Sequence, residues 1–157
     1  MALNKKFLKY WHQYWHLSLL LLITFTITTL YLSFNLSFYK SVSVRAGLCD
    51  FSTDLANTPS KQYKGLSDRK ALRSDEGMLF IFNEIKDKSF VMRNMNFPLD
   101  IIFIRNHKII NLYHDLRPEG SQPQNTYHSG EPVDAVLEIS AGQSRSCHLG
   151  VGTEVIW

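Results

Sequence analysis

Hydrophobic and polar positions divide the chain into two parts with different patterns. Residues 17–39 form a stretch without a charged side chain, rich in Leu, Ile, Phe and Thr. A helix of about 20 such residues is long enough to cross the hydrocarbon core of a bilayer. From Cys49 onward the apolar residues come in short runs that are separated by Gly, Pro, Asn and charged residues. Such short runs favour strands over helices, which need about ten residues or more.

The N-terminal part is predicted to direct the rest of the chain out of the cytoplasm. Residues 1–16 are basic and aromatic, which is typical of a tail that stays in the cytoplasm beside a membrane span. We therefore predict a transmembrane signal anchor over residues 17–39. The alternative is a signal peptide cleaved after Ala46, although the apolar core of a signal peptide is normally only about 7–15 residues long. In both cases the C-terminal domain would be periplasmic or extracellular, membrane-anchored or secreted.

The remaining residues predict a mostly β domain over residues 49–157, preceded by a linker over residues 40–48. Two apolar runs, Met78–Phe82 and Leu99–Ile104, are predicted as buried strands at its centre. Asn106 is expected in a hairpin turn after the second run, because Asn tolerates positive φ. We predict a compact small β-barrel-like domain or a folded antiparallel sheet. Further strands are expected over Cys49–Ala56 (an edge strand), Lys108–His114, Val133–Ser140 and Gly150–Trp157.

Two short helices and one long loop complete this prediction. Thr58 is suited to cap a helix that runs into residues 63–66. A second short helix or turn is expected over Gln143–Leu149. Residues 116–130 are rich in Pro, Gly, Ser and Gln and predict a loop long enough to be functional or mobile.

Composition and charge exclude several function classes. The net charge of +3 comes from 17 Lys and Arg against 14 Asp and Glu, which is too small and too evenly spread to predict nucleic-acid binding. Cys49 and Cys147 form no CxxC motif, so a zinc ribbon or thioredoxin-like site is excluded. Outside the cytoplasm they could form a disulfide; two unpaired or buried thiols are the alternative. No phosphate loop or cofactor motif is present, and the histidines have no metal-site spacing.

Several short motifs together resemble a known family. Gly77-Met78-Leu79-Phe80 is followed by Met92 and Asn94 and then by the run Pro98–Phe103. Leu137-Glu138 precedes Ala141-Gly142. In this order the motifs are similar to those of the family called domain of unknown function 192, which comprises small exported or membrane-anchored bacterial and archaeal proteins. The resemblance covers about residues 50–156. It implies a compact β-barrel-like domain and no agreed biochemical activity.

Two departures from the family pattern bear on the site and on a turn. The family usually has Trp where this chain has Val91, and that change removes a large aromatic wall from any pocket there. The family usually has Gly where this chain has His107, in the turn after the central strand.

Two acidic residues stand out because they interrupt apolar strands. Asp100 lies among Leu99 and Ile101–Ile104, and Glu138 lies in Ala135–Ile139. A buried carboxylate is costly unless it is paired or hydrogen-bonded. For Asp100, Arg69 and Arg93 are the expected arginine partners. Each acid could instead tie down a neighbouring loop, line a ligand site, or form half of a general acid/base pair.

We predict a ligand-binding cleft lined by Arg69, Met92, Asn94, Asp100 and Glu138. Met95 and Phe90 could add to a soft apolar pocket, because methionine adapts to varied ligands. The same alternating residues could equally be ordinary core.

Three functions follow from these patterns. The first is a non-catalytic, membrane-tethered domain that binds a small molecule or an envelope protein. The second is an envelope hydrolase that uses Asp100 and Glu138. The third is an accessory subunit of a larger membrane complex.

Overall fold

The computed structural model describes residues 5–35 and 39–157. The chain forms two compact units, Met1–Phe38 and Tyr39–Trp157. Within the described residues, the first unit contains helix α1 (Lys5–Asn35) and the second contains the strands. No helix in the described residues is long and apolar enough to cross a membrane. The span predicted over residues 17–39 is therefore unsupported. Residues 36–38 of that span and residues 1–4 of the predicted tail lie outside the described residues.

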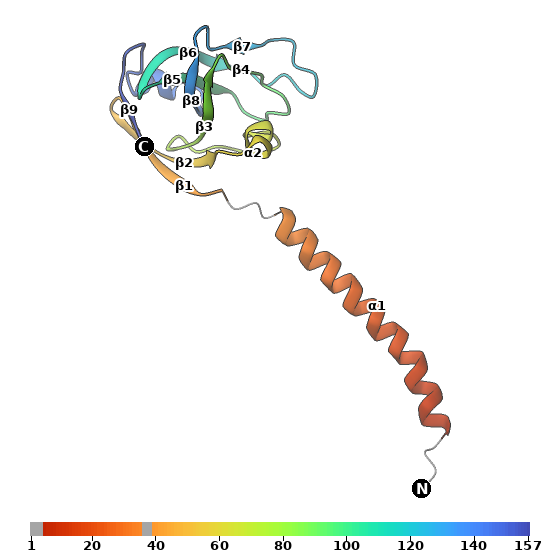
Figure 1. Ribbon diagram of the computed structural model, residues 1–157. Coiled ribbons are helices and arrows are strands. Elements are labelled where there is room, and N and C mark those ends of the chain that lie inside the picture. Colours follow the sequence, from red (N-terminus) through yellow and green to blue (C-terminus); the bar gives the residue numbers. More distant parts are fainter. Residues whose placement is uncertain (1–4, 36–38) are drawn as a thin grey trace. The chain divides into compact units, whose positions relative to one another are not determined.

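The second unit is built on one seven-stranded sheet with the order β6-β5-β8-β3-β2-β1-β9 (Figure 1). A two-stranded ribbon of β4 and β7 and two short helices, α2 (Pro59–Lys64) and α3 (Gln143–Ser146), complete the unit. The strands are β1 (Ser41–Ala46), β2 (Cys49–Ala56), β3 (Glu76–Lys86), β4 (Ser89–Phe90), β5 (Leu99–Arg105), β6 (Lys108–Leu116), β7 (Tyr127–His128), β8 (Val133–Ser140) and β9 (Val155–Ile156).

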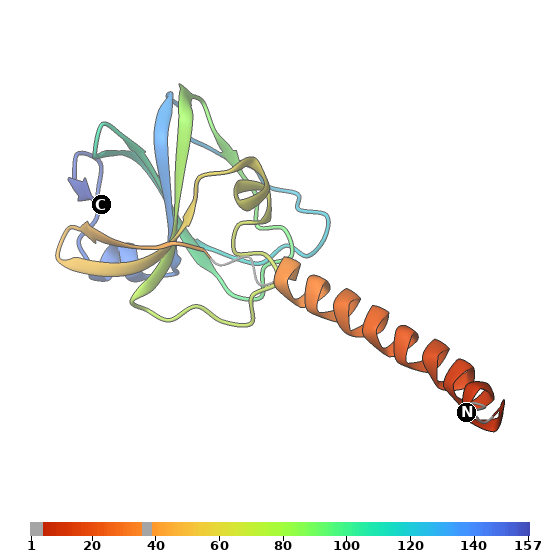
Figure 2. The same cartoon turned by 60° about the horizontal axis from the view of Figure 1, so that its bottom comes forward.

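The sheet curls into a half-barrel, which can be followed in both views of the domain (Figures 1 and 2). The C-terminal segment contacts both of its edges. Val155 pairs with Ala46 of β1, whereas Glu154 forms a bridge with Lys108 at the start of β6. The backbone N–H of Ile109 also donates to the carbonyl of Thr153 at 3.0 Å. The last residues therefore tie the two ends of the sheet together.

Both faces of the central strands are buried, so the sheet separates two apolar clusters. All six residues from Leu99 to Ile104 are buried. Ile102, Ile104 and Leu137 belong to the first cluster, which also includes Phe51 of β2. Ile101 and Phe103 belong to the second cluster, with Phe80, Met92 and Leu66. This second cluster brings strand residues together with the segments around α2 and β4.

Most of the predicted elements are present, but the N-terminal edge of the sheet differs. Residues 40–48 were predicted as a linker, yet residues 41–46 form β1 and pair with β2. The edge position predicted for Cys49–Ala56 is therefore wrong, because β2 lies between β1 and β3. A purely antiparallel sheet is also wrong, since β2 and β3 are parallel and α2 lies in the connection between them. The segment SVSVRA alternates polar and apolar residues, a strand pattern that the linker prediction overlooked.

The predicted turns and caps agree well with the structure. Thr58 caps α2, accepting a hydrogen bond from the N–H of Lys61. Asn106 and His107 form the turn between β5 and β6, with φ of 49° and 60°. His107 lies where the family usually has glycine, and its ring stacks against Trp157 with the ring centroids 4.3 Å apart. That contact and a 3.0 Å hydrogen bond from Nδ1 to the carbonyl of Val155 hold a histidine in a conformation that favours glycine.

Candidate functional site

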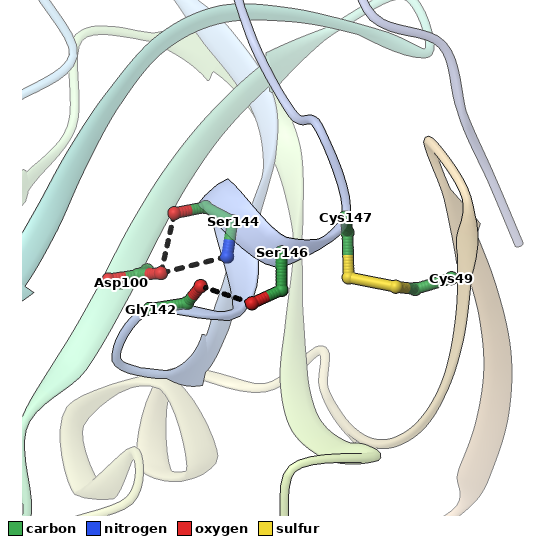
Figure 3. The surroundings of a disulfide bond; sticks show 6 residues. All are labelled: Cys49, Asp100, Gly142, Ser144, Ser146 and Cys147. Atoms are coloured by element: carbon green, nitrogen blue, oxygen red, sulfur yellow. Dashed lines mark hydrogen bonds between the residues drawn. A yellow bond between two sulfur atoms is a disulfide. The ribbon is translucent and has the colours of Figure 1, made fainter.

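Asp100 is fully buried and holds the start of α3 against β5 (Figure 3). Its Oδ2 accepts hydrogen bonds from the backbone N–H of Ser144 at 2.9 Å and from the Ser144 hydroxyl at 2.5 Å. Its Oδ1 accepts a third from the backbone N–H of Asp115 at 2.8 Å. These three donors offset the cost of burying the carboxylate. Asp100 thus anchors the start of α3 and the end of β6.

The arginine partner predicted for Asp100 is wrong. Arg69 pairs with Asp54 at 2.5 Å, and Arg93 donates to the carbonyl of Tyr63 at 3.1 Å. Backbone and hydroxyl donors from α3 and from the end of β6 take the place of an arginine.

The other end of α3 is held by a disulfide. Cys147 is joined to Cys49 at the start of β2, with Cα atoms 5.5 Å apart (Figure 3). The bond links residues 98 positions apart and leaves no free cysteine in the described residues. Of the two alternatives that the sequence left open for the cysteines, the structure has the disulfide.

Glu138 lies one rung away from Asp100 but faces the opposite side of the sheet. Asp100 pairs with Ile139, whereas Glu138 pairs with Ile101. Directly opposed residues share a face and successive residues alternate, so the two carboxyl groups point away from each other. They cannot flank one substrate bond, as the acid and base of a glycosidase must. The hydrolase hypothesis therefore has no geometric support.

Glu138 has an environment unlike that of Asp100. Its side chain is only 6% exposed, and in the described part of the chain its Oε2 has no hydrogen-bond partner. Burial raises the pKa of Glu138 to about 8, although the positive charge of Arg69 acts against the rise. The carboxyl group is therefore mostly protonated at neutral pH, when it can donate as well as accept a hydrogen bond.

Glu138 faces a pocket of about 260 Å³ between α2, β3 and the segment around β4. Phe80, Phe82 and Phe90 supply aromatic walls, with Phe80 and Phe90 packed edge to face at 5.0 Å. Leu66 and Met95 add apolar surface. This volume lies just below the range typical of ligand sites, about 300–1,000 Å³.

Gly65 allows the chain to pass close to Glu138 at the end of α2. It has φ 52°, in the left-handed region that favours glycine. A Cβ there would lie 3.9 Å from Oε2 of Glu138 and 3.6 Å from the ring of Phe80. The helix therefore ends directly over the buried carboxyl group, in a conformation that only glycine adopts without strain.

Cationic side chains lie around the same pocket. Lys64, Lys88 and Arg93 are among its lining residues. The ammonium group of Lys88 lies 4.2 Å from the ring centroid of Phe82, and the guanidinium group of Arg93 lies 4.3 Å from that of Tyr63. Lys64 forms an exposed ion pair with Asp68. Three positive charges therefore accompany one largely protonated acid.

The structure brings together only part of the predicted cleft. Glu138 faces the pocket, and Arg69 is close enough to influence it electrostatically. Met92 is buried in the apolar cluster beneath. Asn94 lines a neighbouring shallow cavity with Arg93, in a turn with φ 52°. Asp100 belongs to the opposite face, so the predicted set is divided by the sheet.

Sequence reasoning placed Phe90 and Met95 in a pocket and missed most of its other residues. Phe80 and Phe82 had a detectable signal, since they alternate with Ile81 and so share a face along β3. The cations carried no comparable signal, because exposed lysines and arginines occur throughout the domain. Val91, where the family usually has Trp, also lines the pocket and is 38% exposed. The described residues contain no group of three or more metal-binding side chains.

A family model described as Uncharacterized ACR, domain of unknown function 192, matches residues 42–157. The chain belongs to this family. Two solved structures are similar. A protein of unknown function from Novosphingobium aromaticivorans is 32% identical with a TM-score of 0.71, covering 78% of this chain and 89% of that one. A Sinorhizobium meliloti protein, suggested to be a transcription regulator, is 30% identical with a TM-score of 0.70. The match covers 75% of this chain and 94% of that one. No curated protein matches this chain.

Proposed function

We propose that this domain binds a small molecule in the pocket above Glu138, without catalysing a reaction. The observation that supports binding is the buried Oε2 of Glu138, which faces the pocket and has no hydrogen-bond partner in the described residues. An unsatisfied buried carboxyl oxygen costs about 1–3 kcal/mol, and a ligand that bonds to it recovers part of that cost. Aromatic walls around a single polar group are typical of small-molecule sites.

The test is a fragment screen on the full chain in mild detergent, followed by amide chemical shifts. Ligands of this site should shift the amides of residues 64–67 and 88–91. Glu138→Gln should change the set of fragments that bind, and Val91→Trp should weaken binding by narrowing the pocket. Glu131→Gln is the matched control, because Glu131 is exposed and does not line the pocket. If no fragment shifts these amides, or if Val91→Trp has no effect on the fragments that do, the binding proposal fails.

We further propose that the domain works outside the cytoplasm. The disulfide between Cys49 and Cys147 supports this location, because disulfides persist mainly in oxidising compartments. The uncharged stretch over residues 17–39 supports export, with the segment either retained as an anchor or removed after Ala46. Alkylation of thiols during cell lysis should leave both cysteines unmodified until reductant is added. Mass spectrometry of the purified protein should distinguish retention from cleavage. Two freely alkylated cysteines in fresh lysate would argue for a reducing compartment.

The accessory-subunit hypothesis remains a separate prediction. It requires the full chain to travel with other membrane proteins in mild detergent, and requires deletion of residues 1–40 to abolish that association.

A further inference from the structure

The pocket above Glu138 combines three chemical environments within one small volume. Its buried end presents a carboxyl group, its walls are phenylalanine rings, and its lining includes three cations. Each environment restricts a different part of a ligand. The inference below rests on the small-molecule binding proposed above and specifies the class of molecule.

The lining cations favour a negatively charged ligand group. Lys88 and Arg93 lie over aromatic rings, at 4.2 and 4.3 Å from the centroids, rather than against carboxylates. Arg93 is held in place by two hydrogen bonds to Tyr63, at 3.2 Å to Oη and 3.1 Å to the carbonyl oxygen. A positioned guanidinium group can bind a carboxylate strongly. The backbone of Lys88 is also fixed, because it exchanges hydrogen bonds with Ser129 at 2.9 and 3.0 Å.

The walls favour a flat apolar body. Phe80 and Phe90 pack edge to face and both line the pocket, and aromatic rings offer further edge or stacking contacts to an aromatic ligand. The volume of about 260 Å³ suits a ligand with a body of about one ring.

The buried end favours an uncharged group that can donate and accept hydrogen bonds. Oε2 of Glu138 is without a partner in the described residues, and Arg69 already balances part of any charge that develops on this carboxyl. A ligand hydroxyl could donate to a carboxyl oxygen and accept from a protonated one. A ligand ammonium would instead be repelled by Lys88 and Arg93, which line the same pocket.

We propose that the ligand is a small aromatic carboxylate with a hydroxyl at its uncharged end. Its carboxylate would bind Lys88 and Arg93, its ring would pack on Phe80 and Phe90, and its hydroxyl would bond to Glu138. Three compounds with one ring separate these contributions. 4-Hydroxyphenylacetate has both polar ends, phenylacetate lacks the hydroxyl, and tyramine replaces the carboxylate with an amine.

The experiment measures the affinity of the three compounds for the full chain in mild detergent, by chemical-shift titration. 4-Hydroxyphenylacetate should bind most tightly, and phenylacetate should bind several-fold more weakly. Tyramine should bind at least tenfold more weakly. Lys88→Gln and Arg93→Gln should each weaken 4-hydroxyphenylacetate binding by about tenfold, the usual effect of one charge-assisted hydrogen bond. Lys108→Gln is the control, because Lys108 is exposed and lies outside the pocket lining.

The outcomes distinguish this inference from the proposed function. Tyramine binding as tightly as 4-hydroxyphenylacetate would overturn the carboxylate assignment and leave small-molecule binding standing. If unrelated fragments shift the pocket amides and none of these three compounds does, the proposed ligand class is wrong and small-molecule binding still stands. If neither the three compounds nor any fragment shifts those amides, the proposed function itself fails.

Discussion

Asp100 and Glu138 occupy adjacent rungs of the ladder between β5 and β8, yet their carboxyl groups lie on opposite faces of the sheet. Asp100 accepts three hydrogen bonds from protein donors. Oε2 of Glu138 accepts none from the described residues. Two acids that look alike in the sequence therefore have different roles, one as a structural anchor and the other at the end of a pocket.

Glu138 should make the folded state less stable as pH rises. Its folded pKa of about 8 lies above the ordinary value of 4.5, so between these values the unfolded state releases a proton that the folded state keeps. The free energy of unfolding should therefore fall by about 1.4 kcal/mol per pH unit across this window. Glu138→Gln removes this dependence. Urea unfolding at several pH values should show the variant gaining stability relative to wild type from about pH 5 to pH 8.

Glu131→Gln provides the control for that experiment, since an exposed acid should give a difference that hardly varies with pH. A constant difference between wild type and Glu138→Gln over the same range would show that Glu138 titrates normally.

Asp100→Asn should destabilise the domain by about 2–4 kcal/mol, because the amide NH₂ would face donors that now bond to a carboxylate. The backbone N–H of Ser144 should lose protection from hydrogen exchange, since its 2.9 Å bond to Asp100 is weakened. Asp75→Asn serves as the comparison, because Asp75 belongs to an exposed ion pair with Arg73 and should change stability by less than about 1 kcal/mol. Equal stabilities for the two variants would contradict the anchoring role.

The disulfide should contribute about 4–5 kcal/mol, as chain entropy predicts for a loop of about 100 residues. Replacing Cys49 and Cys147 together by serine should lower the urea midpoint by the corresponding amount. Reductant should lower the midpoint of the wild type and leave that of the double variant unchanged. A wild-type midpoint that is insensitive to complete reduction would show that the bond adds no stability.

Binding of 4-hydroxyphenylacetate should weaken as pH rises through about 8, if this compound represents the ligand class. Ionised Glu138 would then add a negative charge opposite an anionic ligand. The affinity of the Glu138→Gln variant for 4-hydroxyphenylacetate should vary little over the same pH range. An affinity that increases above pH 8 in the wild type would contradict this arrangement. The other charged or titratable groups around the pocket are Tyr63, Lys64, Arg69, Lys88 and Arg93.

The sequence by itself determined the mostly β fold, the family and the central strands. Apart from Asp100, the run Leu99–Ile104 is apolar on both faces, a pattern typical of a buried strand whatever its neighbours are. Thr58 and Asn106 were equally readable, because capping and tight turns depend on local chemistry. β1 was missed although its polar and apolar residues alternate, and its pairing with β2 and β9 shows that it is a strand.

Only the tertiary structure decided what the two buried acids do. Alternation placed Asp100 and Glu138 on faces of their own strands, but only the register between β5 and β8 shows that these faces are opposite. The pocket likewise combines α2, β3, β8 and the segment around β4, which are distant in the sequence. Periodicity reports which side of a strand a residue takes. Which segments cover that side, and whether they bring hydrogen-bond donors or leave a cavity, depends on long-range packing.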